Sequence, residues 1–335
     1  MKKKAVHLVI FSFIIILSFG AVQNPFTLNY VGQLKDDSQM VIKEQDSLYE
    51  EIVARAESYT EPAIDARIDK VWKAVPGYNG LEVDVEASYD KMKKLEDFEE
   101  SRLVFKETSP HVHLADLPPS PIYKGNEQKP MVTFLINVAW GNEYLPDMLK
   151  TLKKHELHTT FFLDGSWVKN NPNLATMLKE EGHEIGNHAY SHPDMSKLTV
   201  GRIDEEIQKT NSVIEATIGV TPEWFAPPSG SFNQTVVDQA HKHGMRTVLW
   251  SVDTVDWRKP DPTEMVNRVV SKVHNGAMIL MHPTEPTAKG LEDLINGVHE
   301  KGYRIGTVSD VLSEERVILG VTLNENRGTN SDKEN

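Results

Sequence analysis

Residues 134–146 read FLINVAWGNEYLP, an apolar strand that turns sharply toward a helix. This strand-to-helix turn opens the regular part of the chain, so its interpretation decides the fold. In α/β enzymes, catalytic residues commonly follow the ends of strands. The only acidic residue of the stretch is Glu143, which lies past the turn. The stretch therefore predicts an α/β fold and leaves open whether the chemistry lies elsewhere.

The strand-then-helix pattern repeats from residue 129 onward. We expect strands at 131–138, 159–163, 183–187, 223–226, 246–252, 277–282 and 303–308. The helices between them end near glycines that suit the left-handed conformation after a helix, namely Gly182, Gly244 and Gly302. Seven such units in about 180 residues predict a parallel sheet with helices outside it. A closed or nearly closed barrel is favoured over an open sheet, which periodicity alone does not exclude.

The composition bounds the class of protein. With 335 residues, the chain has room for two domains or for one large domain with an extension. Its 39% hydrophobic and 25% charged residues allow a sizeable core. The formal net charge of -13 argues against nonspecific binding to nucleic acid, which needs a cationic surface. The absence of cysteine excludes disulfides, thiolate metal sites and a cysteine nucleophile.

The N-terminus carries a predicted export signal. A basic cluster, Lys2 to Lys4, precedes a stretch without charged residues that ends at Val22. Residues 1–22 therefore fit either a signal peptide or a membrane anchor. In both cases the rest of the chain is expected to be exported. If the segment is not cleaved, it is expected to hold the protein at the membrane of the cell envelope.

The rest of the chain divides by composition. The expected parts are a linker, a small α/β accessory module with a Pro-rich connector, a main domain and a disordered tail, at 23–45, 46–128, 129–318 and 319–335 respectively. Within the accessory module, apolar residues recur at helical spacing over 46–75, and strict alternation predicts a short strand from Leu81.

Polar residues follow three of the expected strands. The third strand is followed by His188 and His192, the fifth by Asp253 and Asp256, and the sixth ends at His282. Because the carboxyl ends of barrel strands converge on one face, these side chains are expected to share one pocket. The four-residue spacing of the two first histidines suits zinc, although two histidines alone are a weak signal.

With these residues and the motifs described next, residues 129–315 resemble the polysaccharide deacetylase family, also called the NodB homology family. The resemblance implies a distorted (β/α)7 barrel. It implies removal of N-acetyl groups from peptidoglycan or chitin-like glycans, or of O-acetyl groups from xylan. It also implies a divalent metal, usually zinc. Five short motifs carry the chemistry in this family.

The first motif of the family, Thr-Phe-Asp-Asp-Gly, ends the first strand with the general base and a metal ligand. The family's downstream Glu-Tyr-x-Pro is matched by Glu143, Tyr144 and Pro146. This ungapped register places Asn137 at the base and Val138 at the metal ligand. A shifted register that keeps Gly141 as the motif glycine places Ala139 and Trp140 there instead. The first register is preferred because it needs no gap, and neither supplies a carboxylate.

The second and third motifs are matched in part. The resemblance assigns His188 and His192 to the metal, with Ala189 at a hydroxyl position of the family. The third motif keeps Pro228, assigned to substrate binding, but has Ala226 in place of an arginine that contacts the base in the family. The loss of the arginine agrees with the loss of its partner, because an unpaired cation in a closed site is costly.

The fourth and fifth motifs are matched well. In DTVDW, residues 253–257, the resemblance assigns Asp253 to orienting the catalytic histidine and Trp257 to the wall of the substrate pocket. Leu280 and His282 match the acetyl-pocket residue and the general acid. The acid half of the family's site is therefore present, whereas the charged members of the base half are replaced.

These replacements predict impaired chemistry. Asn137 cannot accept a proton from water at neutral pH, and Val138 cannot bind a metal. Two histidines would hold zinc or another divalent metal weakly or not at all. Asp194 or Glu184 could supply an oxygen, but neither matches a ligand position of the family. We therefore predict an exported pseudoenzyme that binds or acts on cell-envelope glycan, with little or no catalysis.

Other functions stay open at this point. The first alternative is an active, metal-dependent N-acetylglucosamine de-N-acetylase of peptidoglycan with a non-standard base. A second is a scaffold unrelated to glycans. The expected partner is peptidoglycan or another N-acetylglucosamine polymer, and not nucleic acid. The order of export segment, module and variant domain resembles a branch found in endospore-forming bacteria, which implies a role in sporulation or the cell envelope.

Overall fold

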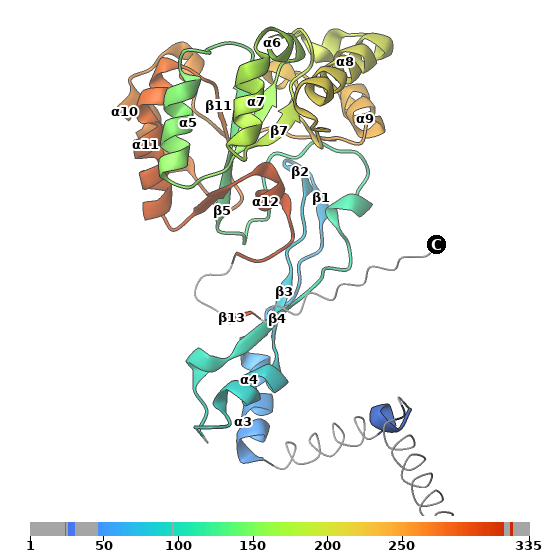
Figure 1. The fold of residues 1–335 in the computed structure, drawn as a ribbon, viewed down its shortest axis with the longest axis vertical. Helices are drawn as coiled ribbons and strands as arrows, with labels where there is room; N and C mark the ends of the chain where they lie inside the picture. The colour runs from blue at the N-terminus through green and yellow to red at the C-terminus, as the bar shows by residue number, and fades with distance from the viewer. Residues whose placement is uncertain (1–23, 25, 31–45, 96, 318–321, 324–335) are drawn as a thin grey trace, which may run out of the picture. The chain divides into compact units, whose positions relative to one another are not determined.

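The computed structural model describes residues 24, 26–30, 46–95, 97–317 and 322–323 of the chain (Figure 1). The predicted export segment lies outside these residues, and so do most of the predicted linker and tail. In the described part of the chain, no helix is long and apolar enough to cross a membrane.

Contacts within the chain divide it into two compact units. The first comprises Met1–Thr60, Glu82–Lys106 and Gly320–Asn335, and the second comprises Glu61–Leu81 and Glu107–Leu319. This division differs from the expected one. The accessory region is shared between the two units instead of forming one module, because its segments pack with different parts of the chain.

The accessory region contains two short helices and a three-stranded sheet. Helix α3 (Ser47–Ala56) and helix α4 (Val85–Met92) each begin after an aspartate whose side chain accepts a hydrogen bond from the first turn. The sheet has the order β13-β4-β3, formed by Thr322–Leu323, Val104–Thr108 and Gly80–Val83. Strand β3 lies where the alternation from Leu81 predicts one.

The helix predicted from apolar spacing over 46–75 is wrong for the second half of this segment. Helix α3 ends at Ala56, and strands β1 (Arg67–Asp69) and β2 (Lys73–Val75) follow as an antiparallel pair. Their turn is held by Asp69, whose Oδ1 accepts from the backbone N–H groups two and three residues further on. Such local bonding competes with the helix, and apolar spacing alone does not reveal it.

The second unit is built on a sheet of eight parallel strands. They are β5 (Met131–Val138), β6 (Thr160–Leu163), β7 (Glu184–Asn187), β8 (Trp224–Phe225), β9 (Arg246–Thr247), β10 (Val252–Asp253), β11 (Met278–Met281) and β12 (Arg304–Gly306). The order is β10-β11-β5-β6-β7-β8-β9, with β12 also paired to β5. The described part of the sheet shows no pairing of β9 with β10, so it curls into an incomplete barrel. The predicted α/β fold is confirmed.

One expected strand is two strands. The apolar run 246–252 contains both β9 and β10, because the chain changes neighbours within it. The backbone N–H of Val248 donates to Phe225 O, whereas that of Ser251 donates to Met278 O. The short strand β9 therefore forms one edge of the sheet, and β10 forms the opposite edge.

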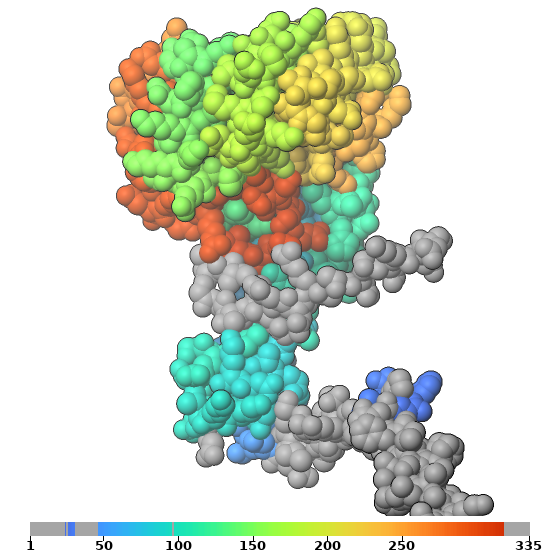
Figure 2. All heavy atoms as spheres, viewed as in Figure 1, coloured from blue at the N-terminus to red at the C-terminus, as the bar shows by residue number. Residues whose placement is uncertain are grey.

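The sheet carries helices on its outer side (Figure 1). They are α5 (Leu145–Lys154), α6 (Gly165–Asn170), α7 (Pro172–Glu180), α8 (Val200–Ile218), α9 (Gln234–Lys242), α10 (Pro262–Lys272) and α11 (Glu285–Glu300). Helix α12 (Val308–Leu312) instead contributes Val308 and Leu312 to the cluster that also contains Leu135. In Figure 2 the spheres of the green and yellow helices α5, α7 and α8 form a continuous surface on the viewed side. The glycines expected after helices have φ of +83°, +76° and +84°, at Gly182, Gly244 and Gly302.

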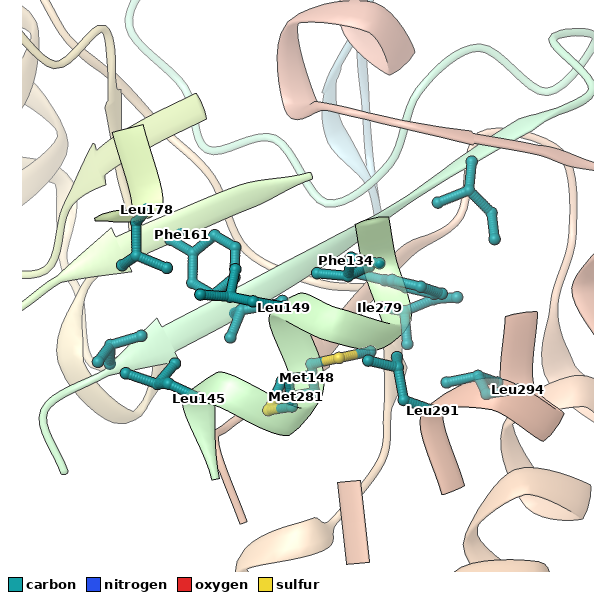
Figure 3. Close-up of a cluster of buried hydrophobic side chains, with 14 of the residues drawn as sticks. Phe134, Leu145, Met148, Leu149, Phe161, Leu178, Ile279, Met281, Leu291 and Leu294 are labelled. Atoms are coloured by element: carbon teal, nitrogen blue, oxygen red, sulfur yellow. The ribbon is translucent and has the colours of Figure 1, made fainter. Parts of the chain in front are cut away.

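Strand β5 separates two apolar layers, because side chains of a strand alternate between its faces. Phe134 packs toward the helices in a cluster with Ile279 and Leu291, and Figure 3 shows these side chains side by side. Leu135 belongs to a different cluster, inside the curled sheet. Asn137, two residues further on, follows the inward alternation. The strand thus carries one polar side chain to the open end of the sheet interior.

Candidate functional site

A cavity of about 470 Å³ lies at the carboxyl ends of the strands. Its lining residues come from the ends of β5, β10 and β11 and from the loops after β7, β8 and β9: Asn137, Trp140, His192, Ser229, Trp250, Asp253, Trp257, Leu280 and His282. Residues more than a hundred positions apart therefore share one pocket, as strand order predicts. Three of the lining residues were not predicted as site residues: Ser229, Trp250 and Trp140. The motifs assigned no role to the first two, and the preferred register assigned none to Trp140.

The end of β5 supplies no acid to this cavity. Asn137 is 3% exposed and lines the cavity, and its Oδ1 has no hydrogen-bond partner among the described residues. Val138 is fully buried in the helix-facing cluster with Leu145 and Met148. The carboxamide of Asn137 can bind a water or a ligand group, but it cannot take up a proton at neutral pH.

The two motif histidines lie together after β7. Their ring centroids are 5.1 Å apart. His188 is buried, and burial lowers its pKa to about 3, so its imidazole is neutral. Its Nδ1 lies 2.7 Å from Ala226 O. Because a carbonyl only accepts, Nδ1 carries the proton and Nε2 keeps a lone pair. Burial also lowers the pKa of His192, against an opposing effect of Asp164.

A buried glutamate holds the loop that carries these histidines. Glu206 of α8 is 3% exposed, and its carboxylate accepts from the backbone N–H groups of Tyr190 and Ser191 at 2.9 and 2.8 Å. The hydroxyl of Ser191 donates to it as well, at 2.9 Å. The loop needs such support, because Ala189 and His192 both have positive φ, which is unfavourable for residues with a Cβ. Motif matching gave no signal for Glu206.

The residues present do not fit a catalytic zinc site, which has three protein ligands and a water. Among the residues that the structure describes, no group of three or more histidines and acids could hold a metal. The two acids considered as substitutes are engaged elsewhere. Asp194 is half-exposed and bonds Lys197 and Ser196. Glu184 begins β7, at the opposite end of the strand, and accepts from Trp224 at 3.0 Å.

The acid half of the site is fully assembled, but with a different aspartate than predicted. His282 Nδ1 lies 2.8 Å from Asp256 Oδ1, and its backbone N–H donates to Asp256 Oδ2 at 2.6 Å. Asp253 lines the cavity instead, and its carboxylate accepts from Val255 N at 2.7 Å. The prediction that Asp253 orients His282 is wrong. Val255 has φ of +51°, and the turn there brings the second acid of DTVDW back to the histidine.

The Asp256 carboxylate is charged although it is fully buried. Burial raises its pKa, but hydrogen bonds and the charge of His282, together with the Thr287 hydroxyl at 2.7 Å, bring the pKa below its usual value. The carboxylate fixes the Nδ1–H tautomer of His282, so Nε2 is directed away from the aspartate. His282 is therefore oriented as a proton donor or a hydrogen-bonding group at the cavity wall.

Aromatic rings form the rest of the wall. Trp257 is 52% exposed, with the Arg258 guanidinium 4.7 Å from its ring centroid. Leu280 lines the cavity as predicted from the acetyl-pocket motif. Pro228 is buried in a short 3-10 helix and does not line the cavity, whereas its neighbour Ser229 does. The third motif therefore lines the cavity through Ser229, and not through Pro228.

Comparison with known proteins gives a consistent result. The sequence profile of the family described as polysaccharide deacetylase matches residues 124–248. The uncharacterized protein YlxY of Bacillus subtilis (strain 168) is 55% identical over 318 residues, which cover 95% of this chain and 100% of YlxY. The peptidoglycan-N-acetylmuramic acid deacetylase PdaA of the same organism is 31% identical over 202 residues, or 59% of this chain and 77% of PdaA.

Solved structures include a protein without enzymatic function. The crystal structure of BA3943, a CE4 family pseudoenzyme from Bacillus anthracis, has 50% sequence identity and a TM-score of 0.79, and it covers 84% of this chain and 100% of that chain. A BA3943 mutant with restored enzymatic activity has 50% identity and a TM-score of 0.78, covering 81% and 100%. The matches extend well beyond the five motifs.

Proposed function

Because the chain belongs to the polysaccharide deacetylase family, we propose that it binds cell-envelope glycan and does not hydrolyse it. One observation carries this proposal. The site is built on one side only: His282 is hydrogen-bonded to Asp256, whereas in the preferred register Asn137 and Val138 stand where the family has two carboxylates. A pocket with a formed acid half and no carboxylate at the family's base position suits binding better than turnover.

The expected loss of rate is large. A general base contributes roughly 10²- to 10⁴-fold to catalysis, and Asn137 cannot act as one. A metal ion would supply an activated water to such a site, and His188 and His192 could hold it only with a third ligand. Ala226 removes the cation that the family places beside the base. Each defect alone lowers activity, and together they leave the site without the family's base and without a third metal ligand.

Glycan is the favoured ligand because of the wall and the relatives. The cavity combines indole rings with an amide, two imidazoles and a carboxylate, which suits a ligand with apolar faces and polar edges. PdaA, which is 31% identical, is a deacetylase of peptidoglycan. An extracytoplasmic location is part of the proposal. It is supported by the basic cluster followed by an uncharged stretch in residues 1–22.

A second candidate is a working, metal-dependent de-N-acetylase with a non-standard base. The assembled pair of His282 and Asp256 favours it, since a general acid without a base has no catalytic use. It requires an unidentified proton acceptor and a third metal ligand. The first proposal requires neither.

The test joins three measurements on the purified full chain. Acetate release from N-acetylglucosamine oligomers and from peptidoglycan should be undetectable, with PdaA as the positive control. Metal content after incubation with zinc and gel filtration should be well below one ion per chain. Pull-down with insoluble peptidoglycan should retain the chain. Acetate release that stops with a chelator would establish the second candidate, and failure to bind peptidoglycan or chitin would refute the first.

A further inference from the structure

The cavity concentrates tryptophan. Three of the six tryptophans of the chain line it, Trp140, Trp250 and Trp257. Two of them keep about half of their surface exposed, 45% for Trp140 and 52% for Trp257. Exposed aromatic surface in a concave site indicates ligand contact, because a flat ring gains from stacking against another apolar face.

Trp140 has an unusual position, because it contacts both halves of the site. Its indole stacks on His282, with centroids 5.4 Å apart and planes inclined by 15°. It also meets His192 edge-on, at 6.0 Å and 71°. The indole thus lies beside the histidine of the acid half and beside one of the two histidines that would bind a metal. The preferred register of the first motif assigns no role to Trp140.

The turn after β5 holds Trp140 in this place. Gly141 has φ of +83°, and a Cβ at this position would lie 1.9 Å from Pro283 O. The turn therefore rests directly on the segment that follows His282, which only a glycine permits. Its carbonyl accepts from Tyr144 N at 3.0 Å, which closes the turn before α5. Trp140 is thus positioned by backbone contacts, and its partly exposed side chain lines the cavity.

The same cavity contains an amide oxygen without a hydrogen-bond partner. The Oδ1 of Asn137 is buried and has no hydrogen-bond partner among the described residues, although the side chain lines the cavity. A carboxamide offers one acceptor and two donors. An acetamido group offers the complementary N–H and C=O. The apolar side chain of Leu280 lines the same cavity and can accommodate a methyl group.

We propose that Trp140 is a sugar-stacking residue that makes this site a metal-independent receptor for N-acetylated amino sugars, with Asn137 binding the acetamido group. The inference rests on the proposed glycan-binding function and names the residues and the ligand class. The indole takes one face of a pyranose ring, and the amide selects the acetylated form. In this arrangement the ligand is held by stacking and hydrogen bonds, without a metal between the histidines.

The test is calorimetric titration of the full chain with the N-acetylglucosamine tetramer. Trp140→Ala should weaken binding roughly tenfold, the loss expected of one stacked ring. Trp140→Phe should keep most of the affinity, because it retains an aromatic face. Trp72→Ala is the matched control, since Trp72 lies outside the cavity and stacks near Lys124, and it should bind like the natural chain. Circular dichroism checks that each variant folds.

Two further arms address the ligand and the metal. The chelator EDTA should leave the affinity unchanged. The glucosamine tetramer should bind more weakly at high salt, where attraction of its ammonium groups to a chain of net charge -13 is screened. Equal binding of both tetramers would overturn selection of the acetyl group, and loss of binding with EDTA would overturn metal independence.

The outcomes separate this inference from the proposed function. If the natural chain binds and Trp140→Ala binds equally well, or Trp140→Phe is as weak as Trp140→Ala, the stacking role is refuted while glycan binding stands. If the natural chain binds neither the tetramer nor peptidoglycan, the proposed function fails, and this inference fails with it.

Discussion

Replacing Asp256 by alanine should destabilise the fold far more than the same change at Asp253. Asp256 is fully buried, and its carboxylate accepts from three donors: His282 N at 2.6 Å, His282 Nδ1 at 2.8 Å and Thr287 Oγ1 at 2.7 Å. A buried donor left without an acceptor costs about 1–3 kcal/mol. Removing the carboxylate also removes its own unfavourable burial, so we expect the free energy of unfolding to fall by about 3 kcal/mol.

Asp253 is the matched control from the same pentapeptide. Its carboxylate accepts one bond, from Val255 N, and its side chain borders the open cavity. Asp253→Ala should therefore cost about 1 kcal/mol or less. Urea denaturation followed by tryptophan fluorescence measures both variants, and an unchanged slope with urea keeps the comparison valid. A cost at Asp253 equal to that at Asp256 would refute the assignment of the His282 partner.

The isosteric change Asp256→Asn separates charge from shape. Two donors meet Oδ2 and one meets Oδ1, so the amide oxygen should keep the pair and the amide nitrogen should face His282 Nδ1. Because that nitrogen only donates, Nδ1 must lose its proton and Nε2 must gain one. Nitrogen-15 chemical shifts of His282 report this change of tautomer directly. Unaltered shifts would contradict the proposed orientation.

Three further predictions concern other parts of the unit. Burial and the neighbouring His158 lower the pKa of His183 to about 4. The neutral imidazole therefore contributes fully to the stability of the fold above the unfolded pKa of 6.5, and this contribution is lost as the pH falls toward 4. The loss in the free energy of unfolding is about 2 kcal/mol at about pH 5. His183→Gln should flatten the stability profile measured by urea denaturation, whereas His241→Gln, at an exposed site, should not. Glu206→Gln should expose the histidine loop to faster hydrogen exchange, since an amide cannot accept the three bonds from the loop and the bond from Arg202 together. Unchanged exchange would contradict the supporting role of Glu206. Asn137→Asp combined with Val138→Asp should raise zinc affinity in calorimetry and give zinc a larger effect on the melting temperature than in the natural chain, and equal zinc binding would contradict the preferred register.

The fold was predictable where the pattern of apolar residues is set by burial alone. Strands β5, β6 and β11 are mostly apolar runs covered on both faces, so their positions follow from the sequence within a residue. The run 246–252 misleads because the apolar residues between the two short strands make it look like one strand, and the change of neighbours between Val248 and Ser251 depends on residues distant in sequence. The turn at Asp69 misleads because a side-chain bond decides it.

The site residues were predictable where they lie at the end of a correctly placed strand. They were unpredictable where a turn of the backbone decides which side chain reaches the site. His188, His192, Leu280 and His282 follow strands that were placed well, and the last three line one cavity. The two aspartates of DTVDW differ by three residues, and only the positive φ of Val255 decides which one meets the histidine. Trp140 was identified only as a member of the rejected register, because its role depends on Gly141 resting on a distant loop.

The pattern of retained and lost residues follows the free energy of burial. Asp256 is kept in a position where it satisfies three donors, so its loss would destabilise the fold even if the protein catalysed nothing. A carboxylate at position 137 would instead be buried on the inner face of β5 and one at position 138 in the helix-facing apolar cluster, and an arginine at 226 would be buried as well. These charges are tolerable together, or with a metal, but each is costly once a partner is lost.

It follows that the first replacement in the base half favours the next. An asparagine at 137 would leave a cation at 226 without its counter-charge, and Ala226 removes that cation. A carboxylate at 138 without a metal would lie unpaired in an apolar cluster, and Val138 replaces it with an apolar side chain. Nothing comparable acts on His282, whose partner also holds the backbone of the strand end. A chain released from catalysis would therefore lose the base half first and keep the acid half as structure, with its aromatic wall free to serve as a binding surface.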